Sequence, residues 1–186
     1  PKKVRPERPP LDVDGDKLSD FVIGDEGYRR LYGSPDAAGR IVETVESAGG
    51  NARTLVRETD GGALALSINY PDRLITCLER NDPTRCLDDG NVDAFTTLVE
   101  ELDHFLVIAE RYRSRGVMSL LDLELHANVT KHLVLKMFVG RMRRATRLSE
   151  ADAAWIRFHL FEKGEFTGPD PHVRARYRDA MRLASR

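Results

Sequence analysis

Residues 92–147 read VDAFTTLVEELDHFLVIAERYRSRGVMSLLDLELHANVTKHLVLKMFVGRMRRATR, and their apolar residues recur every three to four positions. This spacing predicts one helix over about 92–113 and a second over about 119–147. Gly116 separates the two and favours a turn. The stretch is therefore predicted to fold back as an antiparallel helical pair around a shared apolar interior. Because the turn centres on Gly116, a residue of the first helix should lie opposite the residue of the second helix for which the two residue numbers sum to about 232.

The second helix of this pair is predicted to be long, buried and central. Ser119, followed three residues later by Asp122, is a capping-box pattern at its start. Residues 133–139, LVLKMFV, are apolar nearly all round, which is typical of a helix that is covered on every side. The same segment offers more apolar surface than one neighbour can cover, so self-association is expected. Ser149 marks the start of a third helix, and a short fourth helix is predicted after Pro171.

The N-terminal half is predicted to combine one helix with a small sheet. The helix begins at Ser34, which can cap it, and ends before Gly49. Residues 54–57, 63–70 and 74–78 are predicted strands, because each is rich in β-formers and borders a turn sequence. The whole pattern predicts an α+β fold, with a three-stranded antiparallel sheet followed by a three- to four-helix C-terminal bundle around one long buried helix.

The 186 residues are predicted to form a flexible, basic, proline-rich arm over 1–10 and a single α+β domain over 11–186, helical from residue 91. Hydrophobic residues make up 41% and charged residues 32%, a composition that excludes disordered and membrane-spanning classes. Cys77 and Cys86 are too few for a disulfide scaffold, so they indicate reduced thiols and a cytoplasmic location. Cys77 is predicted to be buried in a strand.

Acidic and histidine side chains are predicted to meet between the two long helices. Glu101 and His104 are three residues apart on the first helix, while Glu124 and His132 lie on one stripe of the second. Carboxylates and imidazoles that converge between facing helices bind transition metals, so these four residues are candidate ligands for iron, manganese or zinc. The alternative is that Glu101 and His104 border the apolar face and that His132 is a partnered histidine beside the core.

A run of aspartates near the N-terminus has the spacing of a calcium-binding loop. The carboxylates at loop positions 1, 3, 5 and 9 are Asp12, Asp14, Asp16 and Asp20. Residues 12–24, DVDGDKLSDFVIG, resemble the calcium loop of an FG-GAP propeller repeat or a dockerin-like loop, which implies a calcium site at these aspartates. The stretch departs from that pattern at Lys17, where such loops have glycine, and at Ile23, where a bidentate glutamate is expected. A solvated acidic turn is the alternative.

Arginines give the C-terminal part a basic character. Residues 131–186 carry 13 Lys and Arg against 6 Asp and Glu, whereas residues 1–130 carry 16 against 24. The candidate anion- or nucleic-acid-binding arginines are Arg141, Arg143, Arg144, Arg147, Arg174, Arg178 and Arg182. Arginine suits phosphate because its planar fork binds two oxygens at once. The alternative is that these cations complement helix dipoles and cover apolar surface with their stems.

The motifs of common enzyme classes are missing from the sequence. It has no P-loop, no Gly-x-Gly-x-x-Gly, no Gly-x-Ser-x-Gly, no His-Glu-x-x-His and no Cys-x-x-Cys. We therefore predict a non-catalytic regulatory or adaptor module that binds another protein and has no membrane partner. The alternatives are a metal-binding helical protein, which could be an enzyme, and a nucleic-acid-binding protein that uses its arginine-rich helices.

Overall fold

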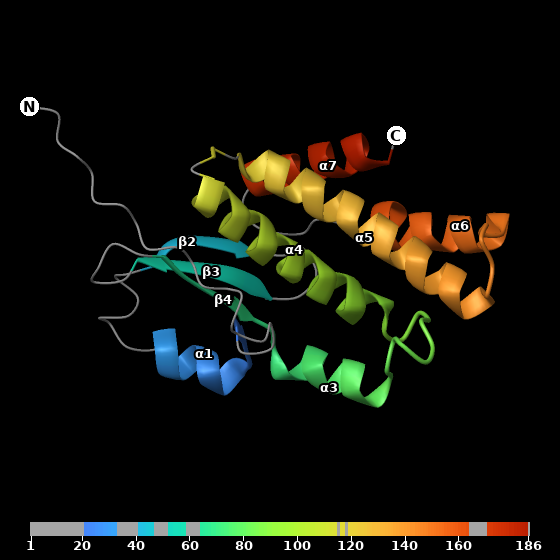
Figure 1. Ribbon diagram of the computed structural model, residues 1–186, viewed down its shortest axis with the longest axis horizontal. Helices are drawn as coiled ribbons and strands as arrows, with labels where there is room; N and C mark the ends of the chain where they lie inside the picture. Colours follow the sequence, from blue (N-terminus) through green and yellow to red (C-terminus); the bar gives the residue numbers. More distant parts are fainter. Residues whose placement is uncertain are drawn as a thin grey trace, which may run out of the picture.

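A computed structural model describes seven stretches of the chain: residues 21–32, 41–46, 52–58, 64–114, 116–117, 119–163 and 171–185. The arm predicted over 1–10 lies outside them. Within them the α+β prediction is confirmed, because a small sheet packs beside a set of helices (Figure 1). The helices are α1 (Asp25–Tyr32), α3 (Asp72–Arg80), α4 (Val92–Ser114), α5 (Leu120–Arg143), α6 (Glu150–Arg157) and α7 (Pro171–Ala184). A π-helical turn, η2 (Phe158–Glu162), continues α6.

The sheet has its strands in the order β1-β4-β3-β2. Three of them, β2 (Ile41–Glu46), β3 (Arg53–Glu58) and β4 (Leu64–Asn69), are antiparallel neighbours. The short β1 (Val22–Ile23) pairs with β4 in parallel. Three antiparallel strands are thus present, of which β3 and β4 match predicted strands, and the added edge strand makes the sheet mixed rather than purely antiparallel.

Two predicted elements have the opposite secondary structure. The segment expected to end a helix forms β2, because IVETVE is dominated by β-branched residues that pack well on a pleated surface. The third predicted strand, 74–78, lies inside α3. Pro71 precedes that helix and Asp72 opens its first turn, which complements the helix dipole. Cys77 therefore lies in a helix, where its thiol donates to the carbonyl of Gly90.

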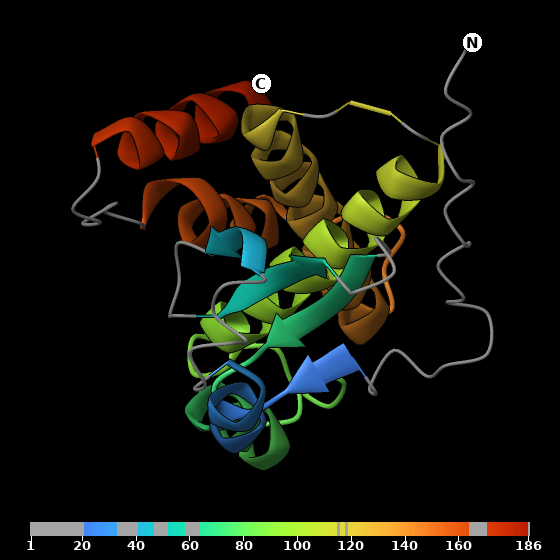
Figure 2. The same cartoon turned by 90° about the vertical axis from the view of Figure 1, so that its left-hand side faces the viewer.

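The elements form successive layers (Figures 1 and 2). Helix α4 packs on β3 and β4 and separates the sheet from α5, which in turn contacts α6, η2 and α7. The predicted antiparallel pair is thus present as α4 and α5. The expected caps of α5 and α6 are also present, since the hydroxyls of Ser119 and Ser149 each accept from the backbone N–H three residues on.

The apolar core is divided into two clusters by α4. One face of α4 carries Phe105 and Ala109 against Val56 and Ile68 of the sheet. A second cluster, near the start of α4, joins that helix to α5 and α6. Full burial of a side chain such as Phe105 contributes about 2–3 kcal/mol. Polar side chains buried on α4 are therefore held in a rigid apolar frame.

The prediction that α5 is covered on every side was wrong. Leu135 and Val139 are buried, but the side chains of Leu133 and Met137 are 62% and 60% exposed. The helices α4, α6 and α7 cover only part of the circumference of α5, and the remaining strip faces outward. None of the helices in the described ranges is long and apolar enough to cross a bilayer.

Candidate metal centre

Three buried side chains from α4 and α5 converge on one point. Glu100 and His104 are four residues apart on α4, which places them on one face of that helix. Glu124 comes from the second turn of α5 and faces them. One ligand atom from each of the three lies within 4.8 Å of those of the other two. The arrangement brings two carboxylates and one imidazole together in the interior of the protein.

His104 is the central residue of this group. Its side chain is fully buried, yet neither Nδ1 nor Nε2 has a hydrogen-bond partner among the residues that the structure describes. Buried imidazoles normally have such a partner, because leaving one unsatisfied costs about 1–3 kcal/mol. Burial lowers the pKa of His104, although Glu100 and Asp103 act in the opposite direction. The ring is therefore neutral at pH 7, the form that binds metals.

Glu124 is the most strongly perturbed carboxyl group of the site. Burial, followed by the repulsion of Glu100, raises its pKa to about 8. Its Oε2 lies 3.9 Å from Nε2 of His104, and its Oε1 lies 3.7 Å from Nη2 of Arg176 on α7. The Tyr177 side chain also hydrogen-bonds to Glu124. Without a cation Glu124 is largely protonated at pH 7, and a bound metal ion would displace that proton.

Glu100 is held by an ion pair that uses one of its two oxygens. Its Oε2 accepts from Nζ of Lys131 on α5 at 2.6 Å. The other oxygen, Oε1, is buried and has no hydrogen-bond partner in the described part of the chain. Lys131 thus orients the carboxylate and leaves a lone pair free for a further ligand.

The donor set of Glu100, His104 and Glu124 fits a divalent transition metal. Mixed imidazole and carboxylate ligands suit Mn²⁺, Fe²⁺ and Zn²⁺. Two atoms bonded to one such ion at about 2.1 Å in tetrahedral geometry lie about 3.4 Å apart, so the ion would draw the donors together by up to about 1.4 Å from their 4.8 Å limit. Three protein ligands leave coordination positions open, as in catalytic rather than purely structural sites.

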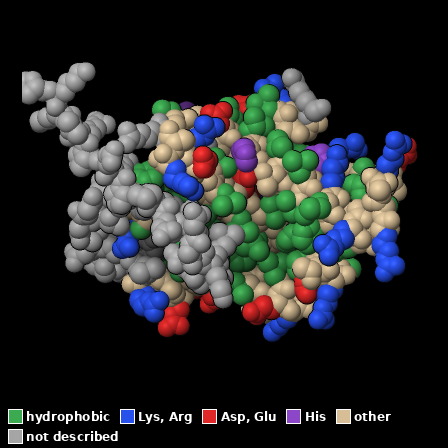
Figure 3. Space-filling view, in the orientation of Figure 1, with side chains coloured by type: hydrophobic (Ala, Val, Ile, Leu, Met, Phe, Trp, Pro, Cys, Tyr) green, Lys and Arg blue, Asp and Glu red, His purple; other side chains and the backbone are tan. Residues whose placement is uncertain are grey.

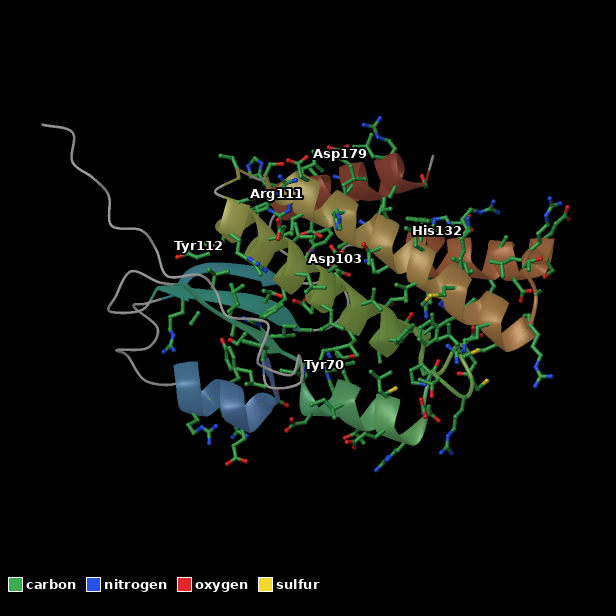
Figure 4. The ribbon with its side chains drawn as sticks, viewed as in Figure 1. Tyr70, Asp103, Arg111, Tyr112, His132 and Asp179 are labelled. Carbon is green, nitrogen blue, oxygen red and sulfur yellow. The ribbon has the colours of Figure 1, made fainter. Side chains whose placement is uncertain are left out.

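Two of the predicted ligands lie elsewhere. Glu101 is fully buried but points to the sheet, where its Oε2 accepts from the Thr54 hydroxyl at 2.8 Å. His132 packs edge-on against Phe161 of η2, with 5.8 Å between ring centroids. Figure 4 shows His132 on α5 next to α6, further along that helix than the region facing Asp103. The structure therefore brings His104 and Glu124 together and adds Glu100 in place of Glu101 and His132.

A second polar cluster lies beside the first. The buried carboxylate of Asp103 accepts from the Thr130 hydroxyl at 2.7 Å and from Nδ1 of His126 at 2.9 Å. Sequence reasoning missed this cluster as well as Glu100 and Arg176. The four-residue spacing of Glu100 and His104 was a local signal that could have identified Glu100.

The candidate arginines do not form one continuous surface. The arginines at 141, 143, 144 and 147 are exposed around the C-terminal end of α5, where Nε of Arg143 contacts Asp152 at 3.3 Å. Helix α7 packs near the start of α5, because Arg176 and Tyr177 contact Glu124. About twenty residues of α5 separate the two groups, which corresponds to roughly 30 Å. On α7, the arginines at 178 and 182 are exposed.

Some of the predicted site residues lie outside the part of the chain that the structure describes. The aspartates of the predicted calcium loop, Asp12, Asp14, Asp16 and Asp20, lie outside the described residues, as does the side chain of Arg174.

Comparison of the chain with protein-family models, curated proteins and solved structures gave no match.

Proposed function

We propose that this protein binds one divalent transition-metal ion, Mn²⁺, Fe²⁺ or Zn²⁺, through Glu100, His104 and Glu124. The observation that carries the proposal is His104, a fully buried imidazole with no hydrogen-bond partner in the described chain, facing two buried carboxylates. A purely structural cluster would satisfy these atoms internally. A metal ion would satisfy all three side chains at once, and its charge would offset the repulsion between Glu100 and Glu124.

The proposal is tested by metal titration of protein that has been stripped with a chelator. We expect one equivalent of Mn²⁺, Fe²⁺ or Zn²⁺ to bind and to raise the unfolding temperature. At a metal concentration of 100 times Kd, the stabilisation is about 2.7 kcal/mol. Isothermal titration calorimetry and a thermal melt, each with and without metal, measure the two effects.

Adjacent glutamates on α4 provide a matched control. Glu100→Gln removes a proposed ligand of the metal. Loss of a residue that only hydrogen-bonds to a ligand weakens metal binding by roughly 10–100-fold, and we expect a larger loss of affinity for this variant. Glu101→Gln changes a neighbouring buried glutamate that faces Thr54, so it should leave metal affinity within about twofold, as for a change outside the site. Equal affinity of the two variants, or no stoichiometric binding to the unaltered protein, contradicts the proposal.

A second candidate function is supported by the outward face of the helical pair. The apolar side chains of Val129, Leu133 and Met137 are exposed and lie four residues apart on α5, and Leu106 of α4 is also exposed. Figure 3 shows hydrophobic side chains gathered near the middle of the face that carries α4 and α5. An exposed apolar strip of this kind is typical of a protein-binding surface. It supports the part of the prediction that concerns binding to a protein.

The charges beside this strip favour a second copy of the chain as the partner. Asp122 and Lys136 are both exposed on α5, and Val129 lies midway between them in the sequence. The two charges are about four helical turns apart, so they lie on the same side of the helix, with Asp122 about two turns before Val129 and Lys136 next to Met137. When two copies pack with antiparallel α5 helices about a twofold axis at Val129, Asp122 of each copy lies opposite Lys136 of the other.

Self-association is tested by analytical ultracentrifugation with three single substitutions. We expect a dimer for the unaltered protein and a monomer for Leu133→Glu, which places a charge in the centre of the apolar strip. Lys136→Glu should weaken the dimer because it opposes Asp122, whereas the same charge change in Arg147→Glu, at an exposed residue beyond the end of α5, should not. A monomeric unaltered protein at about 100 μM, well above typical stable dimer constants, contradicts self-association and leaves a different protein as the partner.

A further inference from the structure

Two cations from different helices contact the candidate ligand carboxylates. Lys131 lies 2.6 Å from Glu100, and Arg176 lies 3.7 Å from Glu124. Both are largely buried, with side chains only 13% and 21% exposed. The Nε of Arg176 is buried and has no hydrogen-bond partner in the described ranges. The site therefore holds positive charge and at least one N–H donor that the described residues do not use.

A bound divalent ion would change the balance of charge in the site. The two positive charges of the ion would add to those of Lys131 and Arg176, so four positive charges would face only the two carboxylates of Glu100 and Glu124. A buried positive charge without a counter-charge is strongly unfavourable. The metal-loaded site therefore favours an additional anion close to Arg176.

The two other buried carboxylates of α4 are engaged by different groups. Glu101 accepts from Thr54 on the sheet side of the helix. Asp103 accepts from Thr130 and His126. Neither of these contacts places a further carboxylate beside Arg176, so the contacts of the described residues supply it with no carboxylate beyond Glu124, and the additional anion would be an exogenous ligand.

On this basis, and resting on the proposed metal site, we propose that the protein binds a small oxyanion, a carboxylate or a phosphate, with one oxygen on the metal ion and another on the guanidinium of Arg176. The planar fork of arginine matches two oxygens of such a group. The guanidinium carbon of Arg176 also lies 5.6 Å from the ring centroid of Tyr177, within cation–π distance. Arg176 is also more exposed than Glu124 and His104, so it lies on the solvent side of the site, where a small anion can enter.

The test uses the full chain loaded with Co²⁺, whose visible spectrum reports its ligands. Acetate and inorganic phosphate are titrated separately, so that the two sources of the oxyanion are distinguished. We expect at least one of them to change the Co²⁺ spectrum and to bind the metal-loaded protein at least tenfold more tightly than the metal-free protein by calorimetry. Arg176→Gln should lower that affinity at least tenfold, and Arg176→Lys, which keeps the charge but loses the fork, should lower it less.

Arg182→Gln is the matched control, because Arg182 is an exposed arginine of the same helix that contacts Asp179. It should leave anion affinity unchanged, and circular dichroism should show every variant folded. Metal binding without any effect of either anion overturns the oxyanion proposal and leaves the metal site standing. Equal anion binding by the Arg176→Gln variant or by metal-free protein also overturns it. Failure to bind Co²⁺, Mn²⁺, Fe²⁺ or Zn²⁺ overturns both proposals.

Discussion

The interface between α4 and α5 contains two buried polar clusters that differ in how far the protein satisfies them. In the first, the Asp103 carboxylate accepts from Thr130 and His126, and it has its partners within the fold. In the second, His104 and one oxygen each of two glutamates, at 100 and 124, are buried without hydrogen-bond partners in the described chain. The clusters are adjacent on α4, since Asp103 directly precedes His104. Since both are in the same apolar frame, the difference supports the proposal that the second cluster binds a ligand, and it predicts that the first cluster contributes to stability alone.

The largest expected effect is on metal affinity, and it distinguishes His104 from His132, the two histidines that the sequence analysis predicted as ligands. His104→Ala should weaken metal binding at least about a hundredfold, or about 2.7 kcal/mol, because it removes the nitrogen ligand of the proposed site. His132→Ala should leave metal affinity unchanged, since His132 packs against Phe161. Calorimetric competition against a chelator of known affinity measures both. If the two substitutions weaken binding equally, the ligand cluster is misassigned.

The next effect concerns how the free energy of unfolding of the metal-free protein, measured in the presence of a chelator, depends on pH. The pKa of Glu124 is raised from 4.5 to about 8 by burial and by Glu100, so the folded protein holds a proton that the unfolded chain releases. This contribution to stability is fully present below pH 4.5 and is lost as pH rises towards 8, by at most about 1.4 kcal/mol per pH unit. The contribution of Glu124 to the free energy of unfolding should therefore fall by about 2–3 kcal/mol between roughly pH 5 and pH 7, while the lowered pKa of buried His104 contributes a change of opposite sign around its unfolded value of 6.5.

Glu124→Gln isolates that contribution, because glutamine does not titrate. The variant should lack the fall that Glu124 causes over the same pH interval in urea unfolding. Parallel pH profiles for the variant and the unaltered protein would show that Glu124 is ionised throughout and that Lys131 and Arg176 dominate its environment.

The sequence was sufficient to predict which residues of α4 and α5 lie opposite each other along the helical pair. The turn at Gly116 placed positions summing to about 232 side by side, and the contacts of Glu100 with Lys131 and of Asp103 with Thr130 agree closely. Helical spacing and one glycine are local features, so they define how far along each helix two residues lie. The α4–α5 pair and the α+β class follow from them.

The rotation of each helix about its axis was not predictable. Consecutive residues differ by about 100° around a helix, so a modest rotation decides whether Glu100 or Glu101 faces α5. That rotation depends on the sheet, where Thr54 binds Glu101. A stripe of every fourth residue also drifts by about 40° per step, so His132 points about 80° away from Glu124. The contact of α7 with Glu124 comes from a separate helix, and no local pattern indicates it.

The smallest effect tests whether the satisfied cluster is structural. Thr130→Val keeps the shape of the side chain and removes the hydroxyl that donates to Asp103, leaving His126 as the carboxylate's partner in this cluster. The expected loss is about 1 kcal/mol in the free energy of unfolding, the net value of one hydrogen bond, measured by urea unfolding. Metal affinity should not change, because Thr130 is not among the three residues whose ligand atoms converge in the described structure. A loss of metal affinity without a loss of stability would instead show that both clusters belong to one extended site, in which Asp103 helps to orient the ligands.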